Sequence, residues 1–417
     1  MRHAGRQLDL LRRASGFRLL FGATLASGLG TWLAVVALTV DVFDRTHSAK
    51  WVSALLIADF LPAVLIGLFF GPLLDRLSRR RLMIVSDLAR VAVFAALPFT
   101  DTAGGIVVLA GAAGFATGFF RPAVFAGLPN LVSERDLPEA NSLLRSVEYL
   151  TTTVGTLLGG VIAAASGPHP AYWVNAASFL VSAAFIVRIP GRWLQSTEAV
   201  SRGHWRDLVE GFSLIRRSRT LMAVFVVWNL VMLHNGAVNV AEIALAKVSF
   251  HAGSFGFGLM WAFSGIGLAL GSLLAALWLT RRGMRFVYTA SVAAMAIGSA
   301  CAAVSPDVWV AIWFIALGGA GNGAAIVYNS LLVQWDVPDR LRGRAFTVLM
   351  SSTFAVMGLG MIVAGPLTDR FGPRWLYAGA AAVAAVAALA GSVLTRGIPD
   401  AASKETEREV EPVSVAG

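Results

Sequence analysis

Twelve apolar runs, each about as long as a membrane-spanning helix, take up most of this chain. A transmembrane helix needs about 20 predominantly apolar residues to cross the hydrocarbon core of a bilayer. Of the 417 residues, 57% are hydrophobic and only 14% are charged, whereas soluble domains carry roughly 25% charged residues. The sequence therefore predicts an all-α membrane protein with twelve transmembrane helices, at residues 17–40, 51–74, 82–100, 103–125, 146–166, 170–188, 219–246, 254–279, 285–304, 307–330, 346–366 and 374–395.

Two segments of the sequence are imperfect copies of each other, 205 positions apart. Membrane proteins built from two parallel repeats place a substrate site where the repeats meet, near the bilayer midplane. We therefore expect two pseudo-symmetric six-helix bundles, at 1–188 and 219–396, with a cytoplasmic linker at 189–218 and a disordered cytoplasmic tail at 397–417. The matching pairs are Val132 and Val337, Ala140 and Ala345, Gly160 and Gly365, Gly167 and Gly372, and Pro168 and Pro373.

The net charge of +10 comes from basic residues concentrated on one side of the membrane. With the N-terminus inside, the outer loops hold Arg45, Lys50, Lys247, Arg370 and Arg374, and nearly all other basic residues fall on the inner side. This positive-inside bias predicts a multi-pass protein of the cell (inner) membrane with both termini in the cytoplasm. The basic charge thus indicates topology, and we expect a lipid bilayer rather than nucleic acid as the partner.

The loop after the second run reads Gly71-Pro-Leu-Leu-Asp75-Arg76-Leu-Ser-Arg79-Arg80-Arg81. It resembles the signature loop of the major facilitator superfamily, which has Gly, Asp and basic residues at this spacing, although Ser78 stands where the family often has Gly. Further segments, such as Phe119–Ala123 and Val337–Arg344, are similar to the branch that includes bacterial drug, macrolide and siderophore exporters. The resemblance covers nearly the whole chain. It implies the major facilitator fold and export of an amphipathic small molecule by alternating access, coupled to proton entry.

The charges of this loop predict a gate rather than a substrate site. Asp75 can cap the positive N-terminus of a neighbouring helix, and Arg76 can pair with Asp87 of the third run. A basic loop that only sets topology would explain Arg79–Arg81 but not Asp75. The corresponding loop of the second half, Gly271 to Arg282, lacks the acid, so the latch is expected to be one-sided. The predicted gating residues are Gly71, Asp75, Arg76, Arg79, Arg80, Asp87 and Arg90.

Polar residues that share helix faces predict the substrate cavity. In the seventh run, Trp228, Asn235, Asn239 and Glu242 are spaced by 7, 4 and 3 positions and so lie on one face. For the Asn residues, interhelical hydrogen bonds are the structural alternative. The other candidates lie on the first, fourth and tenth runs, which line the cavity in the family that the chain resembles: Thr24, Ser27, Thr31, Trp32, Arg121, Asn322 and Asn329.

Three carboxylates within the runs, Glu242, Asp59 and Glu148, are candidates for proton coupling. A carboxyl group that is neutral when buried and ionised when hydrated can carry a proton. We favour Glu242, because its polar stripe points it toward the cavity. Glu148 has a basic neighbour three positions away, Arg145, which can neutralise it, as Arg90 can neutralise Asp87. Asp41 and Asp44 lie nearer the outer end and are expected to be solvated.

The sequence contains no nucleotide-binding, metal-binding or catalytic motif. We therefore expect no cofactor and no enzymatic activity, and an ion gradient or the substrate's own gradient as the energy source. The family resemblance implies that the ion is a proton, and we expect a monomeric carrier of a small-molecule substrate. A lysophospholipid or siderophore carrier is an alternative within transport. A non-transporting receptor or scaffold of the same fold is an alternative of another class, although a scaffold has no need of the signature loop.

Overall fold

The computed structural model describes residues 2–69, 77–194, 212–213, 215–216, 218–279, 283–337 and 339–396, which form helices and no strand. The long helices are α1 (Arg2–Arg13), α2 (Ser15–Thr46), α3 (Ala49–Phe69), α5 (Arg79–Ala96), α6 (Ala103–Gly127), α7 (Leu137–Ser166), α8 (His169–Val187), α10 (Arg219–Ala244), α11 (Gly253–Leu279), α12 (Met284–Val304), α13 (Val308–Asp336), α14 (Asp339–Phe371) and α15 (Pro373–Leu394). Short helical turns are η1 (Leu97–Phe99), η2 (Leu128–Asn130), η3 (Glu134–Asp136), η4 (Gly191–Trp193) and η5 (Leu245–Ser249).

Twelve of these helices are long and apolar enough to cross a membrane, so the predicted number is confirmed. Several extend beyond the apolar runs: α2 continues to Thr46, and α7 begins at Leu137. Such ends can lie in the headgroup region, where polar residues are hydrated. The sequence did not predict α1, whose Leu10 is buried and whose Arg13 forms a 2.7 Å ion pair with Asp136.

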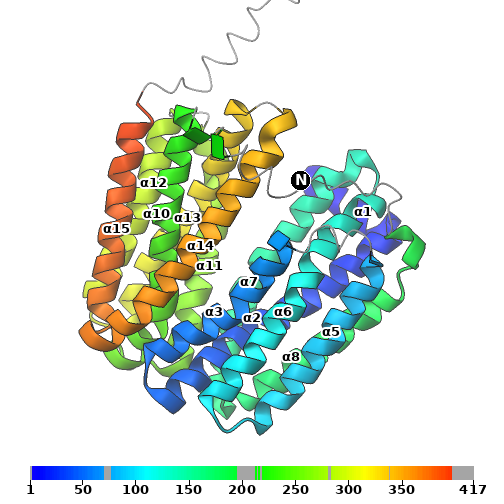
Figure 1. The fold of residues 1–417 in the computed structure, drawn as a ribbon, viewed down its shortest axis with the longest axis horizontal. Coiled ribbons are helices and arrows are strands. Elements are labelled where there is room, and N and C mark those ends of the chain that lie inside the picture. Colours follow the sequence, from blue (N-terminus) through cyan, green and yellow to red (C-terminus); the bar gives the residue numbers. More distant parts are fainter. Residues whose placement is uncertain are drawn as a thin grey trace, which may run out of the picture.

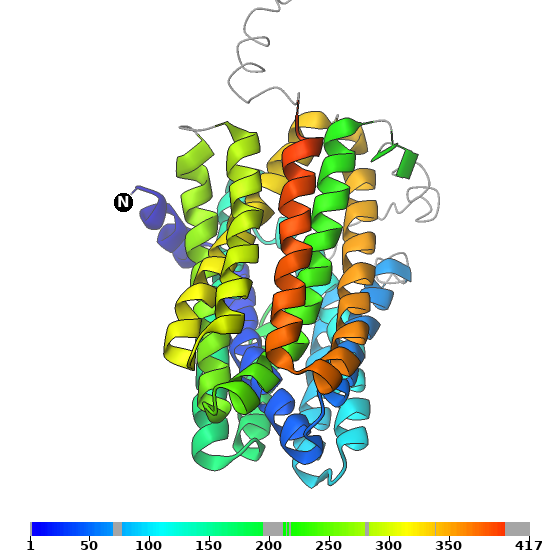
Figure 2. The same ribbon diagram turned by 90° about the vertical axis from the view of Figure 1, so that its left-hand side faces the viewer.

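Helices α2 to α8 form one bundle and α10 to α15 form a second (Figure 1). The bundles meet at the end that carries the α2–α3 and α14–α15 turns, which we call the joined end (Figures 1 and 2). They diverge toward the end that carries α1 and the last turn of α15, which we call the terminus end (Figure 1). The all-α fold of two six-helix bundles is therefore as predicted. Most of the predicted linker and the whole predicted tail, at 195–211 and 397–417, lie outside the described residues.

The duplicated glycines have matching places in the two bundles. Gly167 and Gly372 follow α7 and α14 with φ of +76° and +86°, a conformation that L side chains rarely adopt. Gly160 and Gly365 lie where the bundles meet. A Cβ on Gly160 would be 2.8 Å from Gly258 Cα, and one on Gly365 would be 2.9 Å from Lys50 Cα. These glycines therefore permit close backbone contact between the bundles.

Cysteine labelling should place the joined end outside the cell, because the basic loops predict a cytoplasmic terminus end. In a Cys301→Ala background, we expect a membrane-impermeant maleimide to label intact cells carrying cysteine at Thr102, Pro168, His251 or Pro306. Cysteine at Ser78 or Gly283 should react only after permeabilisation. Labelling of the Ser78 variant in intact cells would reverse the predicted orientation.

Candidate functional site

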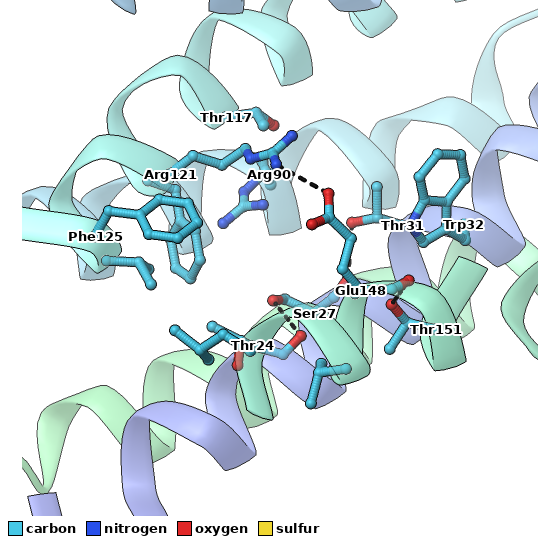
Figure 3. Close-up of a pocket in the computed structure, with 15 residues that line it drawn as sticks. Thr24, Ser27, Thr31, Trp32, Arg90, Thr117, Arg121, Phe125, Glu148 and Thr151 are labelled. Carbon is cyan, nitrogen blue, oxygen red and sulfur yellow. Dashed lines mark hydrogen bonds and ion pairs between the residues drawn. The ribbon is translucent and has the colours of Figure 1, made fainter. Parts of the chain in front are cut away.

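A cavity of about 200 Å³ lies in the first bundle, among α2, α5, α6 and α7 (Figure 3). It brings together five of the predicted substrate residues and the coupling candidate Glu148. Its wall also contains Arg90, predicted as a gating residue, and hydroxyl and aromatic groups that were not among the predicted site residues. The lining side chains include Thr24, Ser27, Thr31, Trp32, Arg90, Thr117, Phe120, Arg121, Phe125, Glu148 and Thr151.

The hydroxyl groups of α2 face the cavity because Thr24, Ser27 and Thr31 are three and four positions apart. Each hydroxyl donates to a backbone carbonyl of the preceding turn; for example, Thr31 Oγ1 donates to Ser27 O at 2.7 Å. A hydroxyl oxygen has two acceptor lone pairs. With their protons engaged, these groups offer acceptors rather than donors to a ligand.

Arg121 of α6 and Glu148 of α7 form the exchangeable ion pair of this cavity. Arg121 Nη2 donates to Glu148 Oε1 at 3.1 Å, and the two side chains are 63% and 40% exposed (Figure 3). The prediction that Arg145 neutralises Glu148 is wrong, because Glu148 faces the cavity and meets Arg121 there. Exposed ion pairs contribute about 0–1 kcal/mol. Either charge can therefore exchange its partner for a ligand group at little cost.

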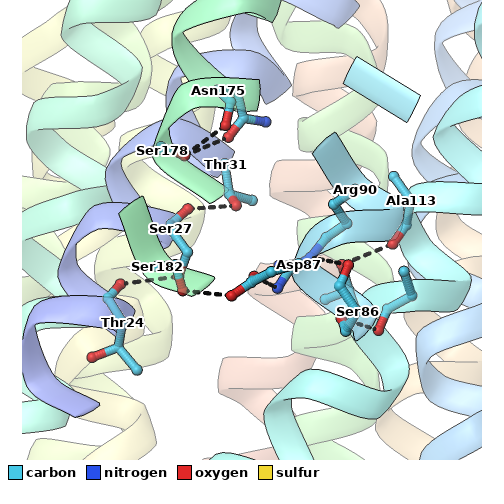
Figure 4. A network of polar contacts seen from close by, with 12 residues as sticks. Thr24, Ser27, Thr31, Ser86, Asp87, Arg90, Ala113, Asn175, Ser178 and Ser182 are labelled. Atoms are coloured by element: carbon cyan, nitrogen blue, oxygen red, sulfur yellow. Dashed lines mark hydrogen bonds and ion pairs between the residues drawn. The ribbon is translucent and has the colours of Figure 1, made fainter. Parts of the chain in front are cut away.

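Asp87 and Arg90 form a second ion pair, which is fully enclosed (Figure 4). Arg90 Nη2 lies 2.5 Å from Asp87 Oδ1, and Ser182 Oγ donates to Asp87 Oδ2 at 2.8 Å. The Arg90 guanidinium also lies over the rings of Phe120 and Phe179, 4.5 and 4.2 Å from their centroids. Both carboxylate oxygens of Asp87 are thus engaged within the first bundle. The predicted partner Arg76 lies outside the described residues, as do Gly71 and Asp75.

Replacing Asp87 by Asn should destabilise the fold by about 3–5 kcal/mol, because it removes the ion-pair partner of the buried Arg90. SDS titration followed by tryptophan fluorescence would measure the change. Asp44→Asn is the matched control, since Asp44 pairs with Lys247 but its side chain is 51% exposed. The control should change stability by less than about 1 kcal/mol. Equal losses in the two variants would contradict a structural role for the buried pair.

The two remaining gating candidates bind backbone carbonyl groups inside the first bundle. Arg79 Nη1 donates to Ala126 O near the end of α6, and to Leu194 O, at 2.9 and 3.0 Å. Arg80 Nη2 donates to Val187 O, at the end of α8. Cations are favourable at helix C-termini, where carbonyl groups lack intrahelical partners. These contacts tie the start of α5 to its neighbours.

The candidates of the second bundle do not line this cavity. Trp228 belongs to a buried apolar cluster, and Asn329 Oδ1 accepts a 2.8 Å hydrogen bond from the hydroxyl of Tyr288. This bond joins α12 to α13, so Asn329 makes an interhelical hydrogen bond, which is the structural alternative to lining the cavity. Asn235, Asn239 and Asn322 are half-buried, on α10 and α13.

The acidic residues toward the joined end differ in their surroundings. Glu242 is buried, and its Oε1 has no hydrogen-bond partner among the described residues. Asp59 is half-buried, and no ion pair is identified for it among the described residues. Asp41 is buried, with hydrogen bonds of 2.6 Å from Arg45 Nε and 2.7 Å from the hydroxyl of Tyr172, so the expectation that it is solvated is wrong. The buried Asp41 therefore belongs to a hydrogen-bonded network with Arg45 and Tyr172.

The wall residues that sequence reasoning missed follow the same helical spacing as those it found. Phe125 lies four positions after Arg121, and Thr151 lies three positions after Glu148, which places each pair on one face. Trp261 of α11 also lies near the cavity, because its ring is 5.8 Å from that of Trp32. Nothing in the sequence links these two tryptophans, which belong to different bundles.

Comparison with known proteins shows similarity along almost the whole chain. The model of the transmembrane secretion effector family matches residues 11–415. The multidrug efflux pump Tap of Mycolicibacterium fortuitum is 28% identical over 371 residues, which cover 85% of this chain and 89% of Tap. The uncharacterized MFS-type transporter YfiS of Bacillus subtilis is 25% identical over 374 residues, covering 87% and 89%. A bacterial homologue of the human lysosomal transporter Spinster has the same fold, with a TM-score of 0.75 at 13% identity over 92% of this chain and 98% of that chain.

Proposed function

This chain belongs to the transmembrane secretion effector family of the major facilitator superfamily, and from that premise we propose that it exports an amphipathic small organic molecule in exchange for protons. It is a multi-pass membrane transporter with efflux-pump relatives, not an enzyme. In the proposal it acts as a monomer in the cell (inner) membrane, with both termini in the cytoplasm.

The observation that carries the proposal is the composition of the cavity in the first bundle. Its wall combines aromatic and apolar groups with hydroxyl acceptors and the Arg121–Glu148 pair. Pockets for small organic ligands combine apolar walls with a few polar groups that orient the ligand. Arg90 adds no free charge, because Asp87 neutralises it. The cavity therefore suits an uncharged solute, or a cation that takes the place of Arg121 beside Glu148.

Alternating access is supported by the arrangement of the two bundles. The bonds that we identify between them lie at the joined end, where Ser53 Oγ donates to Met361 O at 2.6 Å and Lys247 pairs with Asp44. The bundles diverge at the terminus end (Figure 1). If the terminus end is cytoplasmic, this arrangement corresponds to an inward-facing state of the transport cycle.

We place proton coupling at Glu148, because it lines the cavity and its partner is exchangeable. A carboxylate that binds either a proton or the substrate cation couples proton entry to substrate export. Glu242, favoured by the sequence, remains the second candidate because it is buried in the second bundle with an unpartnered oxygen. Asp59 is the third.

Replacing Glu148 by Gln should lower substrate accumulation driven by a pH gradient by at least about 10-fold, because an amide cannot exchange a proton. Ethidium uptake into inverted proteoliposomes, with and without a pH gradient, would measure it. Downhill exchange should persist, since the cavity keeps its shape. Glu139→Gln on the same helix is the matched control, because Glu139 pairs with Arg6 at 3.9 Å, away from the cavity.

Glu242→Gln distinguishes the two carboxylates in the same assay. If it alone loses gradient-driven uptake, the coupling site moves to the second bundle. Gradient-driven uptake by the Glu148 variant at the rate of the unmodified protein would contradict the present assignment. Lysophospholipid and siderophore transport belong in the same substrate panel. Absence of flux for all substrates would favour a receptor or scaffold.

A further inference from the structure

A carboxylate of the second bundle caps a helix of the first. Asp369, near the end of α14, accepts hydrogen bonds from three groups at the start of α3. Ala49 N donates to Oδ1 at 2.6 Å, Ser48 Oγ donates to Oδ2 at 2.6 Å, and Lys50 N donates to Oδ2 at 3.3 Å. These residues are about 320 positions from Asp369 in sequence, so the contact joins the two bundles directly.

The start of α3 needs such an acceptor. The first amide groups of a helix have no intrahelical partner and carry the positive end of the helix dipole. A Ser directly before a helix normally accepts from these amides with its own side-chain oxygen. Here Ser48 instead donates its hydroxyl to Asp369. The cap of α3 is therefore supplied by the opposite bundle and is lost if the bundles separate at this end.

The sequence around Asp369 repeats the signature loop. Gly365-Pro-Leu-Thr-Asp369-Arg370 matches Gly71-Pro-Leu-Leu-Asp75-Arg76 at five of six positions. The first copy follows α3, and the second ends α14, a helix that contacts α3 and runs in the opposite direction. Asp75 lies outside the described residues, so the inference rests on Asp369 alone.

We propose that Asp369 is the latch of the joined end. By capping α3, it stabilises the conformation in which the bundles meet at this end, and opening the joined end requires the three hydrogen bonds to break. This role rests on the alternating access proposed above. Asp369 does not line the cavity, so its proposed role is to hold the bundles in one arrangement and not to bind the substrate.

Electron–electron distances between spin labels across the joined end test the latch. Cysteines replacing Ser166 and Pro306, which are exposed at this end in the first and second bundle, would carry the labels in a Cys301→Ala background. In nanodiscs without substrate or gradient, the unmodified latch should give mainly the short distance. Asp369→Ala should raise the ratio of long to short distances roughly 5- to 30-fold, which corresponds to a cap of about 1–2 kcal/mol. Asp369→Asn, which keeps one acceptor oxygen, should give a smaller increase.

Asp307→Asn is the matched control, because Asp307 also caps a helix at the joined end but within its own bundle, accepting from Val310 N at 3.0 Å. It should leave the distances unchanged. The latch is excluded if folded, monodisperse Asp369→Ala keeps the original distances, or if Asp307→Asn shifts them equally. A shift in distances without any substrate flux would support the latch while contradicting the proposed transport.

Discussion

Close backbone contact between the two bundles at one end is the constraint on which the rest of this structure depends. Gly160 lies against Gly258, and Gly365 lies against the start of α3, with no room for a side chain at either place. In lipid there is little hydrophobic force to hold helices together, so packing of small residues and interhelical hydrogen bonds must do so. Contact at this end leaves the bundles free to diverge at the other, which is the asymmetry that a carrier requires.

Two ion pairs beside the cavity of the first bundle differ in exposure: one is fixed and the other is exchangeable. Asp87 and Arg90 are enclosed, and their remaining hydrogen bonds and aromatic contacts compensate for lost hydration. Arg121 and Glu148 are partly exposed in the same cavity. Burial of one pair keeps the architecture constant, whereas exposure of the other allows its charges to change partners during a cycle.

Much of the fold follows from the sequence, because apolar length and repeated residues reflect requirements of the bilayer and of chain turns. The twelve runs correspond to twelve helices, and Gly167 and Gly372 both take a conformation with positive φ. Part of the first-bundle cavity could also be predicted from the sequence, since helical spacing places Thr24, Ser27 and Thr31 on one face. The partner of Glu148 could not be predicted, because spacing along one helix favours Arg145 and gives no information about Arg121 on another helix. Asp41 was misjudged for the same reason: its burial depends on Tyr172, which is 131 positions away.

The two interfaces related by the internal repeat are closed by different means. Between α7 and α11, Gly160 and Gly258 bring backbones together, and no hydrogen bond is identified at that contact among the residues that the structure describes. Between α3 and α14, the matching Gly365 is followed four positions later by Asp369, whose carboxylate caps α3. The position that the repeat pairs with Asp369 is Ala164, which has no group able to do this. Dispersion contacts between glycines tolerate small rotations, whereas a charged cap has a defined geometry and is either made or broken. The α3–α14 interface is therefore the one suited to switch between discrete states, and the α7–α11 interface is suited to stay in contact while the bundles rotate.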